Sequence, residues 1–163
     1  MKISLPDADI EYIENFYSIN EATALFDIFQ QHLLWRQDDI RMFGKIVKIP
    51  RLQAWYGDNN LRYRYSNMTL TAQPWTASLL ALKSKDNEPE LGKTPTIASL
   101  SFGAEREFQL KHISTNAKKN ILLAPGSLLI MKGNTQSSWQ HCLPKKTRKI
   151  APRINLTFRK III

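Results

Sequence analysis

The stretch Arg153-Ile-Asn-Leu-Thr-Phe-Arg159, close to the end of the chain, says more about the fold than any other segment. Apolar and polar residues alternate along it, as the side chains of a β-strand alternate between its two faces. The apolar face would consist of Ile154, Leu156 and Phe158. Because burial in a core accounts for such a face, residues 153–159 are predicted to form a core strand.

The other face of this strand needs a separate explanation, because it carries Arg153, Asn155, Thr157 and Arg159. Two explanations are open. The row can be an ordinary solvated face. Alternatively the two guanidiniums, which six residues of strand separate by roughly 20 Å, can lean together and bind a small dicarboxylate through charge-assisted hydrogen bonds.

A histidine, His141, lies shortly before this strand in the segment Trp139–Pro144. A single histidine is more often a structural residue than a metal ligand. However, a histidine ligand followed by a carboxylate-binding arginine is the arrangement of oxygenases that use iron and 2-oxoglutarate. Their metal site is a facial triad of two histidines and one carboxylate, with positions left free for other ligands.

Short strands and turns precede the last strand at regular spacing. The alternating or apolar segments are Ala98–Phe102, Phe108–Leu110, Ser127–Met131 and Trp139–Leu143. Glycines and prolines separate several of them. Upstream, residues 20–36 are predicted to form a helix capped by Asn20, and Pro74 is predicted to open a second short helix. The fold class is therefore predicted to be α+β and mainly β, a jelly roll with helices at its N-terminal side.

The composition favours a folded domain with a polyanionic partner. The chain has 163 residues, 43% of them hydrophobic, which suits a single domain over 1–163 with its own core. Lysine and arginine number 23 against 14 acidic residues, giving a net charge of +9. This charge favours nucleic-acid phosphates, although solubility alone could also explain it. Cys142 is the only cysteine, which fits a reducing compartment, and the most apolar stretches, such as Ile121–Leu123, are too short to cross a bilayer. We expect a cytoplasmic or nucleoid-associated protein without membrane contact, and a monomer.

Ordered sequence blocks between Arg41 and Lys160 resemble the AlkB family of oxidative nucleic-acid demethylases, especially its DNA-repair branch. The blocks are RMFGK (41–45), IPRLQAWYGD (49–58), YRYS (63–66), PW (74–75), DNEPELG (86–92), PTIASLSFGAEREF (95–108), GSLLIM (126–131), NTQSSWQHCLP (134–144) and APRINLTFR (151–159). Residues 1–40 match no block. The resemblance implies a double-stranded β-helix, Fe(II) as cofactor, 2-oxoglutarate as cosubstrate, and alkylated DNA or RNA as substrate.

The resemblance also implies a role for individual residues. The implied roles are iron ligation by Asp86 and His141, 2-oxoglutarate binding by Arg153, Asn155 and Arg159, and contact with the damaged base by Phe43, Arg51, Tyr63, Tyr65 and Glu88. Within this set, Arg153 would pair with the distal carboxylate and Arg159 with the end near iron. Phe43 would lie in the loop that enters the gap left by an extruded base, which the other substrate residues would hold. For several of these residues, packing or a solvated turn is an equally simple explanation.

The sequence departs from the family pattern near residues 84–86. Family members carry there a core strand, then the first iron-binding histidine two residues before the aspartate. In this chain Ser84 stands in that position, and the segment LLALKSK leads directly into DNEPELG. One core strand is therefore expected to be absent, leaving a neighbouring strand unpaired. Neither His112 nor His32 is expected to replace the missing ligand.

Two functions follow from these observations. The first is an Fe(II)/2-oxoglutarate-dependent dioxygenase that repairs alkylated bases, with activity reduced or lost because one ligand is missing. The alternative is a catalytically inactive AlkB-like module that still binds nucleic acid through its basic and aromatic residues. A deletion in the gene and an error in the sequence would both explain the missing segment.

Overall fold

The structure is a computed structural model that describes residues 1–42, 44–58, 62–65, 68–86 and 97–159. Of residues 42, 62–65, 68–70, 85 and 86 it describes only the backbone. The chain forms two compact units, one of residues 1–31 and 87–163 and the other of residues 32–86. The expectation of a single domain over 1–163 stays a prediction.

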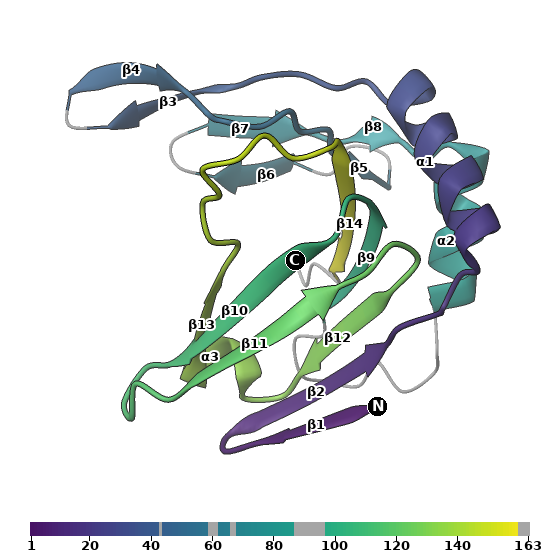
Figure 1. Cartoon of the computed structure of the whole chain (residues 1–163). Helices are drawn as coiled ribbons and strands as arrows, with labels where there is room; N and C mark the ends of the chain where they lie inside the picture. Colours follow the sequence, from purple (N-terminus) through teal and green to yellow (C-terminus); the bar gives the residue numbers. More distant parts are fainter. Residues whose placement is uncertain (43, 59–61, 66–67, 87–96, 160–163) are drawn as a thin grey trace. The chain divides into compact units, whose positions relative to one another are not determined.

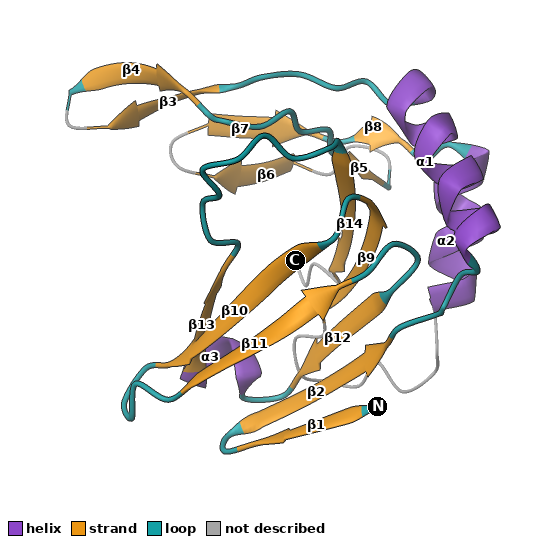
Figure 2. Cartoon of the chain, in the orientation of Figure 1, coloured by secondary structure: helices purple, strands orange, loops and turns teal. Residues whose placement is uncertain are grey.

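The first unit contains two antiparallel sheets (Figures 1 and 2). The larger sheet has the strand order β1-β2-β12-β9-β14, with bounds Lys2–Leu5, Ala8–Ile13, Leu128–Lys132, Ile97–Gly103 and Arg153–Arg159. The smaller sheet has the order β11-β10-β13, with bounds Lys118–Leu123, Arg106–His112 and Trp139–Cys142. A short helix, α3 (Thr135–Ser138), precedes β13. This mainly β, antiparallel architecture confirms the predicted class and fits a jelly roll.

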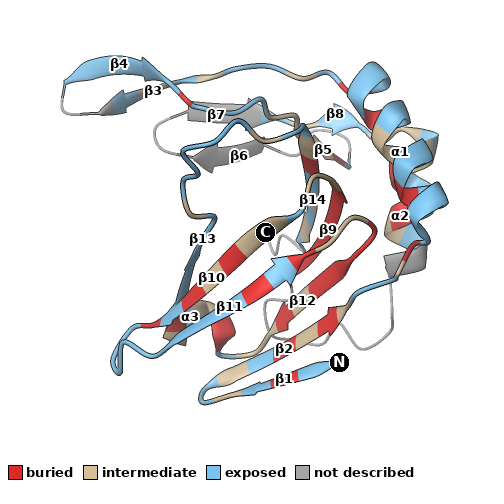
Figure 3. Ribbon diagram, viewed as in Figure 1, coloured by how far each residue is buried: buried red, intermediate tan, exposed pale blue. Residues whose placement is uncertain are grey.

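The core of this unit combines side chains from both sheets. Its buried members are Ile3, Ile10, Tyr12, Ile97, Phe108, Leu110, Ile121, Leu123, Leu129, Met131 and Trp139. Buried residues concentrate along β9 and β12 in Figure 3. Since Ile97 lies opposite Arg159 in the register of β9 and β14, the polar row of β14 shares a face with core residues.

The other face of the larger sheet packs against helix α1 (Ile19–His32). Phe29 of α1 is fully buried, and its ring contacts Phe102 of β9 edge to face at 5.6 Å between centroids. The predicted start and end of this helix were wrong. Ser18 and Glu21 form a capping box, because the backbone N–H of Ser18 donates to the Glu21 carboxylate at 2.8 Å and the N–H of Glu21 to Ser18 Oγ at 3.4 Å. The helix therefore begins at Ile19, without Asn20 as its cap, and ends at His32.

Both sheets end on a strand that carries predicted site residues. β14 is the last strand of the larger sheet and β13 the last strand of the smaller one. In the described part of the chain, each of these two strands pairs on one side only. Their outer backbone groups are thus open to pairing.

A glycine corner connects the two sheets between β9 and β10. Gly103 has φ +80°, a conformation that other residues rarely adopt. A Cβ atom there would lie 2.5 Å from the carbonyl oxygen of Pro152 and 2.8 Å from the ring of Phe26. The backbone N–H of Ala104 donates to the same Pro152 oxygen at 3.0 Å. The corner therefore fixes the position of Pro152, which immediately precedes Arg153.

The second unit consists of short strand pairs and one helix. β3 (Asp39–Met42) pairs with β4 (Lys45–Lys48), and β6 (Arg62–Tyr65) pairs with β7 (Met68–Thr71), both antiparallel. β5 (Tyr56–Gly57) and β8 (Gln73–Pro74) form a parallel pair. Helix α2 (Ala77–Asp86) does not open at Pro74 as predicted, because Pro74 ends β8 and Thr76 Oγ1 accepts a hydrogen bond from the N–H of Leu79.

The remaining differences concern elements that the sequence did not predict. The N-terminus forms the hairpin of β1 and β2 ahead of α1, so the expected N-terminal helices reduce to one helix after a hairpin. Strand β11 was also missed. None of the described helices is both long and apolar enough to span a bilayer.

Candidate cosubstrate and metal site

The polar row of β14 is a connected hydrogen-bond network. Arg153 Nη2 donates to Asn155 Oδ1 at 2.8 Å and to Ser101 Oγ of the neighbouring strand at 3.0 Å. Ser99 Oγ also donates to Asn155 Oδ1, at 3.1 Å, and Asn155 Nδ2 donates to Thr157 Oγ1 at 3.0 Å. Ser99 and Ser101 are buried. The row is therefore built into the face of the sheet that carries Ile97 of the core, although Asn155 and Arg159 keep exposed surface.

The guanidinium of Arg153 has a donor left over. Its Nε is buried and has no hydrogen-bond partner in the described part of the chain. Burial, followed by the positive charge of Arg106, lowers the pKa of Arg153 to about 10. A half-buried cation with an unpaired donor is suited to bind an anionic oxygen, because such a contact restores the lost hydrogen bond and balances the charge. The residues present thus fit one carboxylate of 2-oxoglutarate.

His141 lies on β13, opposite Leu110 of β10 in the register of the smaller sheet. Its ring stacks on Phe108 with 5.2 Å between centroids and 25° between planes. Partial burial, and then the positive charge of Arg159, lower the pKa of His141. The imidazole is consequently neutral at neutral pH, which is the form that binds a metal ion.

The structure therefore brings four of the predicted site residues together in two pairs. Arg153 and Asn155 are in direct contact, and Arg159 is close enough to His141 to influence its protonation. All four residues belong to the first unit. Their roles as ligands of iron and 2-oxoglutarate stay predictions.

The described residues do not complete an iron site. Among them, no three His, Cys, Asp or Glu side chains gather as a metal ion would require. Asp86 is the last residue of α2, and its side chain lies outside the described atoms. Ser84, which stands where the family has a histidine, is exposed and donates its hydroxyl to the carbonyl oxygen of Leu80 at 3.0 Å.

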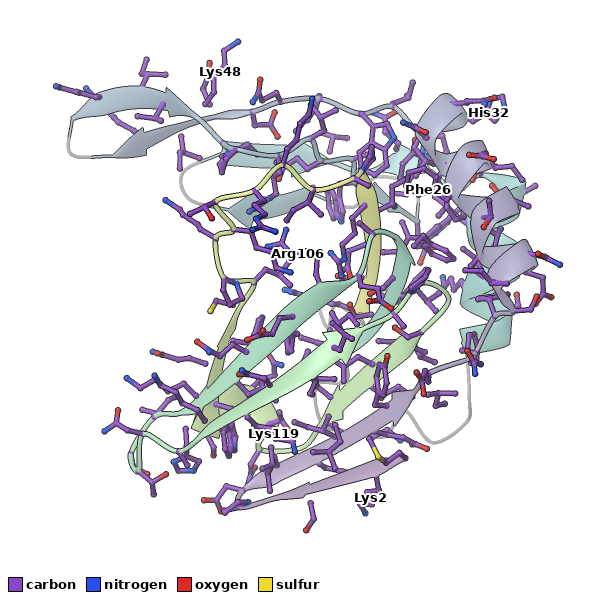
Figure 4. The ribbon with its side chains drawn as sticks, in the orientation of Figure 1. Lys2, Phe26, His32, Lys48, Arg106 and Lys119 are labelled. Atoms are coloured by element: carbon purple, nitrogen blue, oxygen red, sulfur yellow. The ribbon has the colours of Figure 1, made fainter. Side chains whose placement is uncertain are left out.

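The other two histidines have different surroundings. His112 is buried, and its Nε2 lies 3.3 Å from the carboxylate of Asp7. Its Nδ1 lies within hydrogen-bond distance of Ser114 Oγ and accepts from the backbone N–H of Thr115. Since both ring nitrogens have protein partners, His112 is a structural residue. His32 is exposed at the end of α1 (Figure 4).

The five residues predicted to contact the damaged base fall in different parts of the chain. Phe43 and Glu88 lie outside the described residues. Tyr63 and Tyr65 lie on β6, in keeping with their predicted strand parity, but only their backbone is described. Arg51 is exposed in the second unit, between β4 and β5. Their roles in substrate binding stay predictions.

One partly buried arginine whose charge acts on Arg153 was missed from the sequence. Arg106, at the start of β10, donates from Nη2 to the carbonyl oxygen of Pro144 at 2.8 Å, and its Nε is buried without a partner among the described residues. Figure 4 marks its position near the segment that leads from β13 to β14. The alternation of β10 contained a signal, because Arg106 has the same parity as the buried Phe108 and Leu110.

Exposed cations lie on two segments of the first unit. Lys118 and Lys119 are exposed on β11, and the segment from 145 to 149 carries four exposed cations, Lys145, Lys146, Arg148 and Lys149. Their charges are in accord with the expected polyanionic partner.

Known proteins are similar to this chain in sequence. Residues 84–159 match the 2OG-Fe(II) oxygenase superfamily. The chain is 36% identical over 159 positions to DNA oxidative demethylase ALKBH2 of Mus musculus, a match that covers 76% of this chain and 66% of the relative. It is 34% identical over 184 positions to alpha-ketoglutarate-dependent dioxygenase alkB homolog 3 of Bos taurus, with 90% of this chain and 64% of the relative covered. In both matches the chain spans less than two thirds of the relative's length.

Proposed function

Because the chain belongs to the AlkB family of 2OG-Fe(II) oxygenases, we propose that it acts on alkylated bases in DNA or RNA with 2-oxoglutarate and Fe(II). The relatives named above are called a DNA oxidative demethylase and an alpha-ketoglutarate-dependent dioxygenase. The proposal transfers that chemistry to this chain. It includes a monomer in the cytoplasm or at the nucleoid, where its nucleic-acid target would be.

The observation that carries the proposal is the unpaired Nε of Arg153 within the polar row of β14. In the proposed complex, Arg153 binds the distal carboxylate of 2-oxoglutarate, while Asn155 and Arg159 orient the rest of the molecule. His141 supplies a neutral imidazole to iron, and Asp86 a carboxylate. Iron and 2-oxoglutarate would use dioxygen as the oxidant: 2-oxoglutarate would be decarboxylated to succinate, and the N-alkyl group would be oxidised and released as an aldehyde. Phe43, Arg51, Tyr63, Tyr65 and Glu88 would hold the extruded base.

The proposal also includes the absence of one core strand of the double-stranded β-helix, together with the first histidine ligand. Two observations support it. The alignment with the mouse relative is 159 positions long, but only 76% of the 163 residues of this chain take part in it. The relative therefore has residues without a counterpart in this chain. In addition, β13 and β14 each pair on one side only in the described chain. With two ligands from this chain, iron would bind weakly.

A second function is favoured by the same gap. The chain can be a module that binds a dicarboxylate and nucleic acid but turns over little or no substrate. Its specific support is Ser84, which stands where the family has the first histidine and donates its hydroxyl to the carbonyl oxygen of Leu80, beside a row of arginines with an unpaired donor. The net charge of +9 would attract the phosphates of a nucleic acid.

Succinate formation separates the two functions. The whole chain is incubated with iron, 2-oxoglutarate and an oligonucleotide containing 1-methyladenine or 3-methylcytosine. His141→Ala is the inactive control and Lys119→Gln, on the exposed surface, the matched one. An enzyme forms succinate above the level of His141→Ala, and Lys119→Gln stays close to the unchanged chain.

If the unchanged chain and His141→Ala form equal amounts, the enzymatic proposal is wrong. The binding module then predicts that affinity for the oligonucleotide falls steeply with salt. Inserting a family-type strand that ends in His-x-Asp before DNEPELG is expected to restore iron binding and turnover. No gain of iron after this insertion would contradict the proposed gap.

A further inference from the structure

Two arginines with unpaired donors lie next to the corner between β9 and β10. Arg106 follows Gly103 by three residues, and Arg153 lies opposite Gly103 in the register of β9 and β14. The Nε atoms of both arginines are buried without a hydrogen-bond partner among the described residues. Neither guanidinium forms an ion pair with a carboxylate of the described chain.

The chain holds Arg106 in a fixed place. Its Nη2 donates to the carbonyl oxygen of Pro144, just after β13, while the neighbouring Ala104 N–H donates to that of Pro152, just before β14. The start of β10 is thus attached to both ends of the segment that joins the strand of His141 to the strand of Arg153. On β10, Arg106 has the parity of Phe108, which stacks on His141. The side chain therefore belongs to the face of the smaller sheet that carries His141.

The two guanidiniums are close enough to repel each other. The charge of Arg106 contributes to the lowered pKa of Arg153, after burial as the larger cause. Two cations in a partly buried place are unfavourable without a counter-charge, since water screens them poorly there. One carboxylate has two oxygens and about four lone-pair directions, enough to accept a hydrogen bond from each Nε.

We propose that Arg106 is a second arginine of the cosubstrate site, and that its Nε and that of Arg153 together bind the distal carboxylate of 2-oxoglutarate. The inference rests on the proposed function and adds a residue to it. A dicarboxylate fits better than a single anion, because the polar row continues from Arg153 through Asn155 to Arg159 beside His141. One acidic end would lie between the paired arginines and the other near Arg159.

Binding of 2-oxoglutarate to the whole chain, freed of metal by chelation, tests this assignment without relying on turnover. Dissociation constants are measured by calorimetry for the unchanged chain, for Arg106→Gln and for Arg148→Gln. The last variant removes the same charge from the exposed segment after β13. In parallel, 1H–15N spectra follow the Nε–H signal of Arg106 during the titration.

Arg106→Gln is expected to weaken binding about tenfold, the effect of one charge-assisted hydrogen bond. Arg148→Gln should stay within about twofold of the unchanged chain, and the Arg106 Nε–H signal should shift on saturation. Unchanged affinity in Arg106→Gln overturns the assignment but leaves the proposed function standing. If that variant instead loses affinity only for a methylated oligonucleotide, a backbone phosphate is the anion and the assignment is equally wrong.

If the unchanged chain does not bind 2-oxoglutarate at all, both the assignment and the proposed function fail. If Arg106→Gln does not fold, Arg106→Lys retains the charge and the side-chain stem but lacks Nε. It is then expected to bind several-fold more weakly than the unchanged chain, and equal affinity overturns the assignment.

Discussion

Replacing Gly103 with alanine is expected to destabilise the first unit and to displace Arg153. The left-handed φ of +80° costs an alanine about 1 kcal/mol. The added methyl group would also meet the Pro152 oxygen at 2.5 Å and the ring of Phe26 at 2.8 Å, a clash that costs ~1–3 kcal/mol even after relaxation. The free energy of unfolding should fall by about 2–4 kcal/mol, which lowers the melting temperature by roughly 5 to 15 °C for a chain of this length.

A second glycine provides the matched control. Gly133 has φ +56°, but nothing lies within 4 Å of its Cβ position. Gly133→Ala should therefore show the conformational cost alone, about 1 kcal/mol. Urea unfolding, followed by tryptophan fluorescence and circular dichroism, measures both variants. If the two lose equal stability, the contact with Pro152 is not what requires a glycine at 103. Because Pro152 precedes Arg153, Gly103→Ala should also weaken 2-oxoglutarate binding, whereas Gly133→Ala should not.

Three further predictions concern individual side chains. Arg159→Gln should raise the pKa of His141 toward its usual value, because a positive charge that disfavours the imidazolium is removed. An NMR titration measures this pKa, and an unchanged value would contradict the proximity of Arg159 and His141. 2-Oxoglutarate is expected to raise the melting temperature of the unchanged chain and of the control Arg148→Gln, but not that of Arg153→Gln; a rise in Arg153→Gln would be the opposing result. His112→Ala should lower the free energy of unfolding by about 2–4 kcal/mol, because packing on Trp139 and hydrogen bonds are lost. In the control His32→Ala, which changes an exposed residue, the free energy of unfolding should stay within about 0.5 kcal/mol of the unchanged chain. Urea unfolding measures both variants.

Alternation of polarity predicted the strands whose two faces differ sharply. β9, β10 and β14 were found in this way, and the side on which Arg153 and Asn155 lie followed from the same period of two. The hairpin of β1 and β2 was missed because acidic residues interrupt it and Asp7, with φ 54°, makes its turn without a glycine. β11 was missed because three polar residues, 118–120, open it.

The site was less predictable than the strands, because its assembly depends on contacts between the sheets. No spacing rule relates Arg106 to Pro144 or Arg153, since these residues meet only after both sheets have formed. The starts of the helices were also misplaced, because the caps Ser18 and Thr76 were not recognised as such. Family resemblance supplied the roles of His141 and Arg159, while the structure supplied their proximity.

The order of strands in the larger sheet has a consequence for biosynthesis. Its central strands are β12 and β9. β12 pairs with β2, where Leu128 lies opposite Ile13, and β9 pairs with β14, which follows it in the chain by about fifty residues. The indole N–H of Trp139 likewise donates to the Pro6 carbonyl across 133 positions. During translation the first hairpin must therefore wait, with its pairing edge uncovered, until most of the chain has left the ribosome. Strand β14, which carries Arg153 and Arg159, is made after every other strand of its sheet, so a nascent chain that stalls before residue 153 lacks the arginines of the proposed cosubstrate site.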